Sequence, residues 1–122
     1  MIRQPMPLLI WLILFLDALR GRRPMERSRE EQAAVDAETA SLRLFHFDAC
    51  PYCRKVRRDI RLLGLKLPAS DIKLDQEARE ALIHGGGKKQ VPCLRIEEPG
   101  RVRWLYESAD ITSYLRARFA RT

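Results

Sequence analysis

Hydrophobic positions between Leu42 and Phe119 change repeatedly between the two-residue period of a strand and the 3.6-residue period of a helix. The alternating stretches predict strands over 42–47, 72–74, 93–96 and 102–105. The helical spacings predict helices over 53–63, 76–83 and 111–119, the first ended by Gly64 and the second by the glycines at 85–87. The predicted element order is therefore β-α-β-α-β-β-α.

The connections between these elements restrict how the strands pair. A strand–helix–strand unit at the start favours a parallel pair with a crossover helix. The short turn at Pro99-Gly100 favours an antiparallel hairpin between the last two strands. Together they predict an α/β domain with a small, mixed four-stranded sheet and helices on both of its faces.

The first 23 residues have a different pattern, which we interpret as an N-terminal apolar helix. The apolar run Met6–Leu16 is shorter than the roughly 20 residues that cross a bilayer, and a cluster of arginines follows it. These arginines favour either a membrane anchor with its basic side in the cytoplasm or a helix lying in the membrane interface. A signal peptide without a typical cleavage site, and a helix packed on the domain or on a partner, are the alternatives.

Residues 24–41 are polar and rich in Glu, Arg and Ala, which predicts a partly helical linker. This linker would separate the apolar helix from the folded domain that we place at residues 42–122.

The composition then limits the classes of function. The 122 residues suffice for one folded domain, and its net charge of +7 lies in clusters without interleaved aromatic residues, so we do not expect nucleic acid as a partner. Three cysteines are too few for a scaffold held together by disulfides. The two histidines have no ligand-like spacing from a cysteine, so we expect no metal.

Cys50 and Cys53 stand where a predicted strand passes into a predicted helix. Pro51 suits the first helical turn, because its missing N–H would have no helical partner there. The Cys50 sulfur would then lie near free backbone N–H groups and the positive end of the helix, both of which lower the pKa of a thiol. Further positive charge would come from Arg54, Lys55 and Arg57. We expect Cys50 to attack as a thiolate and Cys53 to resolve; a buried structural pair or half of a metal site is the alternative.

Three motifs carry a resemblance to known families. Cys50-Pro51-Tyr52-Cys53 is similar to the dithiol motif of glutaredoxins, and Gln90-Val91-Pro92-Cys93-Leu94 resembles the cis-proline loop of the thioredoxin superfamily. The segment Trp104–Ile111, followed by Tyr114-Leu115, resembles the Glu-Ser segment of the N-terminal domains of glutathione transferases. The resemblance covers residues 42–119 and implies the thioredoxin-like (glutaredoxin) fold of a membrane-attached, bacterial-type glutaredoxin-like protein.

The same resemblance implies a binding site for glutathione. It assigns the site to Tyr52, Gln90, Val91, Pro92, Glu107 and Ser108. The backbone of Val91, before a cis Val91–Pro92 bond, would pair with the cysteinyl part. Glu107 and Ser108 would bind the γ-glutamyl end, with an ordinary helix cap as the alternative. Tyr52 would flank the mixed disulfide or be a surface aromatic residue, and Gln90 would meet the glycyl carboxylate or belong to a solvated loop.

Two positions depart from the family pattern. Many glutaredoxins have a glutathione-binding lysine where this chain has Phe47, so Lys88 or Lys89 would have to supply the charge. Cys93 follows the proline, and we expect strand alternation to turn it away from the face of Val91 into the core. A third redox thiol or a regulatory site is the alternative.

The resemblance implies a glutathione-dependent thiol–disulfide oxidoreductase that acts in electron transport. Glutathione would be its co-substrate, and disulfide-containing or glutathionylated proteins its partners. Glutathione supplies electrons in reducing compartments, so we expect the domain at the cytoplasmic face of the membrane, or soluble in the cytoplasm. A glutathione-binding iron–sulfur carrier stays open, as does a glutathione-transferase-like or membrane adaptor domain without redox turnover. The chain lacks room for the helical C-terminal domain of the transferases, which disfavours their chemistry.

Overall fold

The computed structural model describes Leu12 and residues 25–120. The predicted apolar helix over 1–23 and its attachment to a membrane therefore lie outside the described residues, apart from Leu12. None of the helices in the described part of the chain has the length and hydrophobicity needed to span a bilayer.

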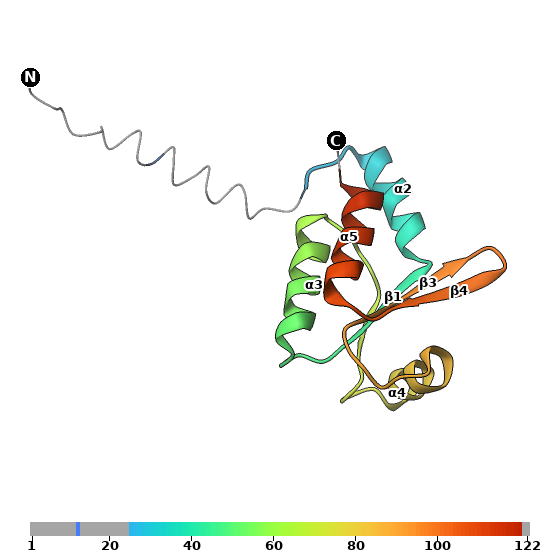
Figure 1. Ribbon diagram of the computed structural model, residues 1–122. Coiled ribbons are helices and arrows are strands. Elements are labelled where there is room, and N and C mark those ends of the chain that lie inside the picture. Colours follow the sequence, from blue (N-terminus) through green and yellow to red (C-terminus); the bar gives the residue numbers. More distant parts are fainter. Residues whose placement is uncertain (1–11, 13–24, 121–122) are drawn as a thin grey trace, which may run out of the picture.

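Four strands form one mixed sheet, as predicted (Figure 1). Strand β1 (Leu42–His46) pairs in parallel with β2 (Ala69–Asp71) and antiparallel with β3 (Cys93–Glu98). Strand β4 (Arg101–Leu105) forms the antiparallel hairpin with β3, so the strand order is β2-β1-β3-β4.

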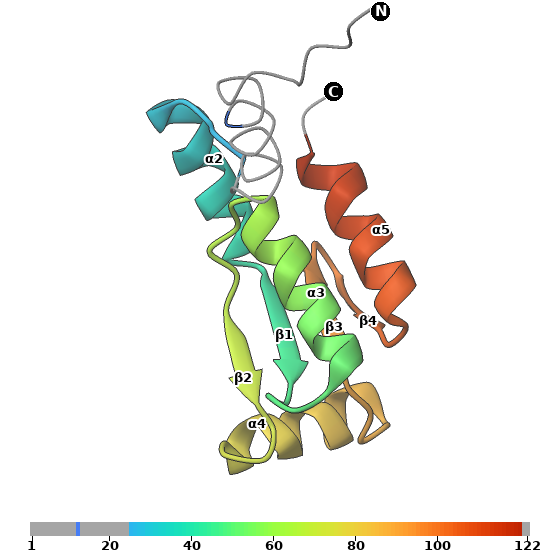
Figure 2. The same cartoon turned by 90° about the vertical axis from the view of Figure 1, so that its left-hand side faces the viewer.

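Helices cover both faces of this sheet, which confirms the predicted layers. Helices α3 (Pro51–Leu62) and α5 (Ser108–Phe119) lie side by side on one face, and α4 (Gln76–Ala81) lies on the other (Figures 1 and 2). In Figure 2, α3 and α5 both begin at the lower end of the sheet, where α4 crosses it. This end of the domain therefore brings the start of two helices close to the loop that enters β3.

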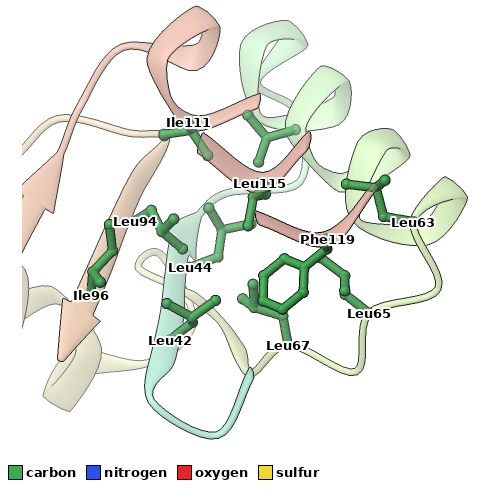
Figure 3. Packing of buried hydrophobic residues seen from close by; sticks show 11 residues of the cluster. Leu42, Leu44, Leu63, Leu65, Leu67, Leu94, Ile96, Ile111, Leu115 and Phe119 are labelled. Atoms are coloured by element: carbon green, nitrogen blue, oxygen red, sulfur yellow. The ribbon is translucent and has the colours of Figure 1, made fainter. Parts of the chain in front are cut away.

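Side-chain alternation along the strands gives the domain two separate cores. On the α3–α5 face, Leu44 and Leu94 pack with Leu115 and other aliphatic side chains (Figure 3). On the opposite face, Phe45 and Cys93, which are register partners across β1 and β3, pack against the α4 side. Successive strand residues point to opposite faces. Leu44 and Phe45, neighbours in β1, therefore belong to different cores, as do Cys93 and Leu94 in β3.

The predicted strand over 72–74 is wrong, because the observed strand β2 ends at Asp71. The Asp71 carboxylate accepts a hydrogen bond from the Lys73 N–H at 2.8 Å, and the chain turns there toward α4. Ile72 is buried, but Leu74 is 87% exposed. Ile72 and Leu74 are two residues apart, which is also the spacing of side chains on one face of a strand. The sequence pattern therefore did not indicate this turn.

The glycines after α4 form a π-helical turn, η1 (Leu82–Gly86), that continues the helix to Gly87. A Cβ atom on Gly85 would lie 2.6 Å from Trp104 Cζ2, and a Cβ atom on Gly86 would overlap Tyr106 Oη. Gly87 has a φ of 84° and ends the turn. The glycines therefore allow η1 to approach Trp104 and Tyr106 closely.

The segment expected to be a linker packs on the domain in its described part. Helix α2 (Arg29–Thr39) forms there, with Ser28 accepting a hydrogen bond from the Glu31 N–H as its N-cap. The Arg27 guanidinium donates to the carbonyl oxygens of Leu63, at 2.6 Å, and Phe119, at 2.9 Å. Partial helicity is as predicted, but these contacts differ from the expected spacer, because they join residues far apart in the sequence.

Candidate active site

The loop after β1 places Cys50 at the N-cap of α3, with Pro51 as the first helical residue. The backbone of Cys50 is extended there (φ −76°, ψ 120°), so the first N–H groups of the helix point toward its side chain. The structure thus confirms the predicted strand-to-helix position of the cysteine pair. Cys50 and Cys53 are both free and buried.

This environment gives the two thiols different pKa values. Burial acts to raise the pKa of Cys50, but hydrogen bonds from the Cys53 N–H, the Cys53 thiol and the Tyr52 N–H, together with Arg57, bring it below the ordinary value. Burial and the neighbouring Cys50 sulfur raise the pKa of Cys53 to about 12. Cys50 is therefore the sulfur that ionises, and Cys53 keeps its proton.

Arg57 is the basic residue that acts on this site most directly. Its guanidinium donates to the Asp48 carboxylate at 3.0 Å and to the Asp48 carbonyl oxygen at 3.1 Å. It thereby holds the loop between β1 and Cys50 against the second turn of α3. Its positive charge also lowers the pKa of Cys50 and, after the larger effect of burial, that of His46.

A cavity of about 210 Å³ lies at the same end of the domain. Its lining consists of Tyr52, Gln90, Val91, Pro92, Tyr106, Glu107 and Ser108. All six residues assigned to glutathione from the sequence thus meet in one cavity, and the Val91–Pro92 bond is cis, as expected. Tyr106 is not among the residues predicted for the site, and its hydroxyl group lies close to Gly86 of η1.

Glu107 and Ser108 are available to a ligand at the start of α5. Glu107 is the N-cap residue, but its side chain makes no capping hydrogen bond. The first N–H groups of α5 are therefore left without the usual side-chain partner, which is a favourable site for a carboxylate. Glu107 is thus an N-cap by position, as in the alternative interpretation, but without the side-chain hydrogen bond of an ordinary cap.

A second cavity, of about 350 Å³, lies next to the first, and Gln90 and Val91 line both. Its other lining residues are Phe47, Ile72, Lys73, Arg79 and Lys89. The Lys73 ammonium lies 4.3 Å from the centre of the Phe47 ring, so a cation from another element stands beside the position that lacks the family lysine. Lys89 lines the cavity as one of the two expected lysines, whereas Lys88 lies over the Tyr106 ring.

Cys93 is a core residue, as expected, with no exposed surface. Burial raises its pKa to about 12. Strand alternation was expected to turn Cys93 away from the face of Val91. This expectation is wrong, because the Val91 side chain packs on the same cluster as Cys93. No group of three or more His, Cys, Asp or Glu side chains within the described residues is arranged to hold a metal ion.

Comparison with known proteins identifies the family. The sequence model of the glutathione S-transferase N-terminal domain matches residues 44–122. The chain belongs to this family. The resemblance of its Glu-Ser segment to glutathione transferases is thereby confirmed, and no curated protein matches the chain significantly.

Solved structures agree with the glutathione S-transferase N-terminal fold. A maleylacetoacetate isomerase from Anaeromyxobacter dehalogenans, with GSH bound in its active site, is 28% identical with a TM-score of 0.50; the match covers 65% of this chain and 38% of the isomerase. A glutathione transferase from Bombyx mori is 22% identical (TM-score 0.51), covering 66% of this chain and 37% of the transferase. A thioredoxin-like protein is 20% identical (TM-score 0.50), covering 61% of this chain and 97% of its own. The thioredoxin-like fold is thus shown, and the chain spans well under half of the isomerase.

Proposed function

We propose that this domain is a glutathione-dependent thiol–disulfide oxidoreductase with Cys50 as its nucleophile and Cys53 as its resolving thiol. The observation that carries the proposal is the pair of unequal thiols at the start of α3. One has a lowered pKa and the other a pKa raised to about 12. A thiolate beside a protonated partner thiol is the arrangement that thiol–disulfide exchange requires.

Glutathione would occupy the two neighbouring cavities in one orientation. Its γ-glutamyl end would meet the open N–H groups of α5, with Ser108 near the carboxylate and Glu107 near the ammonium group. The backbone of Val91 would pair with the cysteinyl part. The glycyl carboxylate would then reach the cations of the second cavity, Lys73, Arg79 and Lys89. Support comes from the isomerase that is 28% identical, whose structure has GSH in its active site.

The proposed reaction follows one of two routes, which depend on the substrate. With a glutathionylated protein, the Cys50 thiolate attacks the glutathione sulfur, forms a Cys50–glutathione disulfide and releases the protein thiolate, which takes up a proton. A second glutathione, as thiolate, attacks the bound glutathione sulfur, forms oxidised glutathione and regenerates the Cys50 thiolate. With a protein disulfide, the Cys50 thiolate attacks one sulfur, forms a mixed disulfide and releases one protein thiolate. Cys53 then gives up its proton and attacks the Cys50 sulfur, which forms a Cys50–Cys53 disulfide and releases the second protein thiolate. Two glutathione molecules reduce this disulfide, become oxidised glutathione and restore both cysteine sulfurs.

The cellular setting is part of the proposal. Glutathione donates electrons only where it is kept reduced, which favours the cytoplasm. The apolar run Met6–Leu16 and the arginines after it would hold the domain at the cytoplasmic face of a membrane. Disulfide-containing and glutathionylated proteins are the partners that this chemistry serves.

A glutathione-coupled reduction assay on cysteine variants tests the mechanism. We expect Cys50→Ser to abolish reduction, because the attacking sulfur is lost. Cys53→Ser should keep much of the activity on a glutathionylated peptide and lose it on a protein disulfide. Cys93→Ala is the matched control and should keep activity on both substrates. Full activity of Cys50→Ser would rule the mechanism out.

Glutathione conjugation or isomerisation is the second candidate, and the family match favours it. In that chemistry the glutathione thiolate itself attacks an electrophile, and the Cys50 sulfur need not form a disulfide. Assaying the same variants with an electrophilic acceptor separates the two. Conjugation that persists in Cys50→Ser, without any disulfide reduction by the parent, would establish the second candidate.

A further inference from the structure

A basic hollow lies on the exposed side of α3, beside the first turn of the helix. Its lining consists of Pro51, Arg54, Lys55 and Arg58, all exposed, and its volume is about 320 Å³. Residues three and four apart share one face of a helix, so Pro51, Arg54, Lys55 and Arg58 form a continuous surface. We call this surface the α3 basic hollow.

The three cations of the α3 basic hollow have no partner within the described part of the chain. Many other arginines there are paired with acids, namely Arg43, Arg57, Arg95, Arg101, Arg103, Arg116 and Arg118. The one acidic residue of α3, Asp59, is buried and binds Arg116 at 2.9 Å. Three like charges thus stand together without neutralisation, which costs folding free energy and favours an anionic partner.

The α3 basic hollow and the glutathione cavity both border the first turn of α3. Tyr52 lines the glutathione cavity and Pro51 lines the α3 basic hollow. Cys50 is the residue directly before both. A disulfide that reaches Cys50 therefore brings its flanking residues next to Arg54, Lys55 and Arg58.

We propose that the α3 basic hollow binds acidic side chains that flank the disulfide of a protein substrate. The inference rests on the proposed function and adds the class of substrate. Exposed charges of this kind steer encounter and select partners more than they add affinity. Their effect is strongest at low salt, because the Debye length falls from roughly 10 Å at 0.1 M to roughly 3 Å at 1 M salt.

An anionic membrane is the other class of surface that could attract these cations, and the position of the hollow disfavours it. A bilayer is broad and flat, whereas the α3 basic hollow is concave and borders the turn that carries Cys50. Lipid headgroups covering it would also obstruct the approach of a disulfide to Cys50. A short acidic segment fills the hollow without that obstruction.

Two glutathionylated peptides test the proposal with the full chain. Both carry the same glutathionylated cysteine; one has three aspartates beside it and the other three serines. We expect kcat/KM at low salt to be about 10-fold higher for the acidic peptide, since each exposed pair contributes modestly. The triple variant Arg54→Gln, Lys55→Gln, Arg58→Gln should bring this ratio close to one, as should 1 M salt in the parent.

The matched control removes three charges elsewhere. Lys66→Gln, Arg101→Gln, Arg103→Gln lowers the net charge equally, at residues whose ion pairs lie outside the hollow. This control should keep the preference for the acidic peptide. Alkylation of Cys50 against pH, measured on both triple variants, should give the same midpoint, because Arg57 and not the hollow cations acts on the thiol.

Three results would overturn the inference while leaving the proposed function in place. The first is a parent that reduces both peptides at equal rates, which contradicts the preference for acidic substrates but not the proposed function. The second is a control variant that loses the preference equally, which assigns the effect to net charge. The third is a hollow variant that keeps the preference but no longer binds phosphatidylglycerol–phosphatidylcholine vesicles, which assigns the surface to lipid. A parent that reduces neither peptide sinks the proposed function and this inference together.

Discussion

At the scale of single residues, the three thiols of the domain differ in pKa and in burial, and the proposed chemistry depends on this difference. Cys50 has backbone N–H donors and Arg57 beside it, whereas Cys53 and Cys93 are buried with pKa values raised to about 12. The difference comes from position, since the same chemical group lies at a helix start, one turn inside the helix, and in the core. Reactivity should therefore be confined to Cys50.

Selective alkylation checks this confinement. In the folded protein at pH 7, iodoacetamide should add to Cys50 alone, because its pKa is lowered, those of the other two thiols are raised to about 12, and the other two sulfurs have no exposed surface. In denaturant all three cysteines should react, and mass spectrometry of peptides counts the adducts. Modification of Cys93 in the folded protein would contradict its assignment to the core.

Arg57→Gln should raise the pKa of Cys50. Only the thiolate reacts, so the alkylation rate rises with pH, and in the parent its midpoint should lie below the ordinary value of a cysteine thiol. Loss of the positive charge destabilises the thiolate and should move the midpoint upward. Arg58→Gln is the control, one residue along the helix, and should leave the midpoint in place. An unmoved midpoint in Arg57→Gln would show that its ion pair with Asp48 is its whole role.

At the scale of elements, contacts between η1 and β4 shape the ligand cavity. Gly85 and Gly86 allow Trp104 and Tyr106 to lie directly on the π-helical turn. Tyr106 then forms part of the cavity wall next to Glu107. A glycine run that suggests flexibility in the sequence is in fact a packing surface.

Gly86→Ala should destabilise the fold and weaken the ligand site together. The added methyl group meets Tyr106 Oη, and such overpacking costs roughly 1–3 kcal/mol. Gly100→Ala is the control: its φ is 79°, but the space around it is open, so it should cost only roughly 1 kcal/mol and leave the ligand site alone. Urea unfolding and glutathione titration measure both effects. Equal costs with unchanged glutathione affinity would show that Tyr106 moves aside freely.

At the scale of the whole molecule, residues 25–40 connect parts of the domain that are distant in sequence. Met25 donates its N–H to the Leu62 carbonyl oxygen at 2.7 Å, and Gln32 donates to the Gly64 carbonyl oxygen at 3.0 Å. Arg27 links the end of α3 to the end of α5. The two helices that begin at the candidate site are thus joined at their far ends by this segment.

Arg27→Met should lower the free energy of unfolding by roughly 1–3 kcal/mol, because a charged donor to two carbonyl oxygens is lost. Arg29→Met, an exposed position in the same segment, is the control and should change stability by less than roughly 0.5 kcal/mol. Denaturant unfolding measures both. Equal stability of the two variants would mean that α2 adds nothing through this arginine.

The cis bond before Pro92 was implied by the family resemblance, whereas local patterns in the sequence determined the order of the elements and the position of Cys50 at a helix start. Both of the latter depend on residues close together along the chain, where periodicity, proline and capping rules apply. The same rules failed at Leu74, because a turn and a strand edge leave the same two-residue pattern.

The tertiary structure alone decided which distant residues meet. Lys73 and Arg79 come from the β2–α4 region, yet they line a cavity with Lys89 and stand near Phe47. Arg57 acts on the loop before its own helix, and Arg27 holds the far end of the same domain. No local motif predicts such contacts, because they arise only when packing of the two cores fixes where each strand and helix ends.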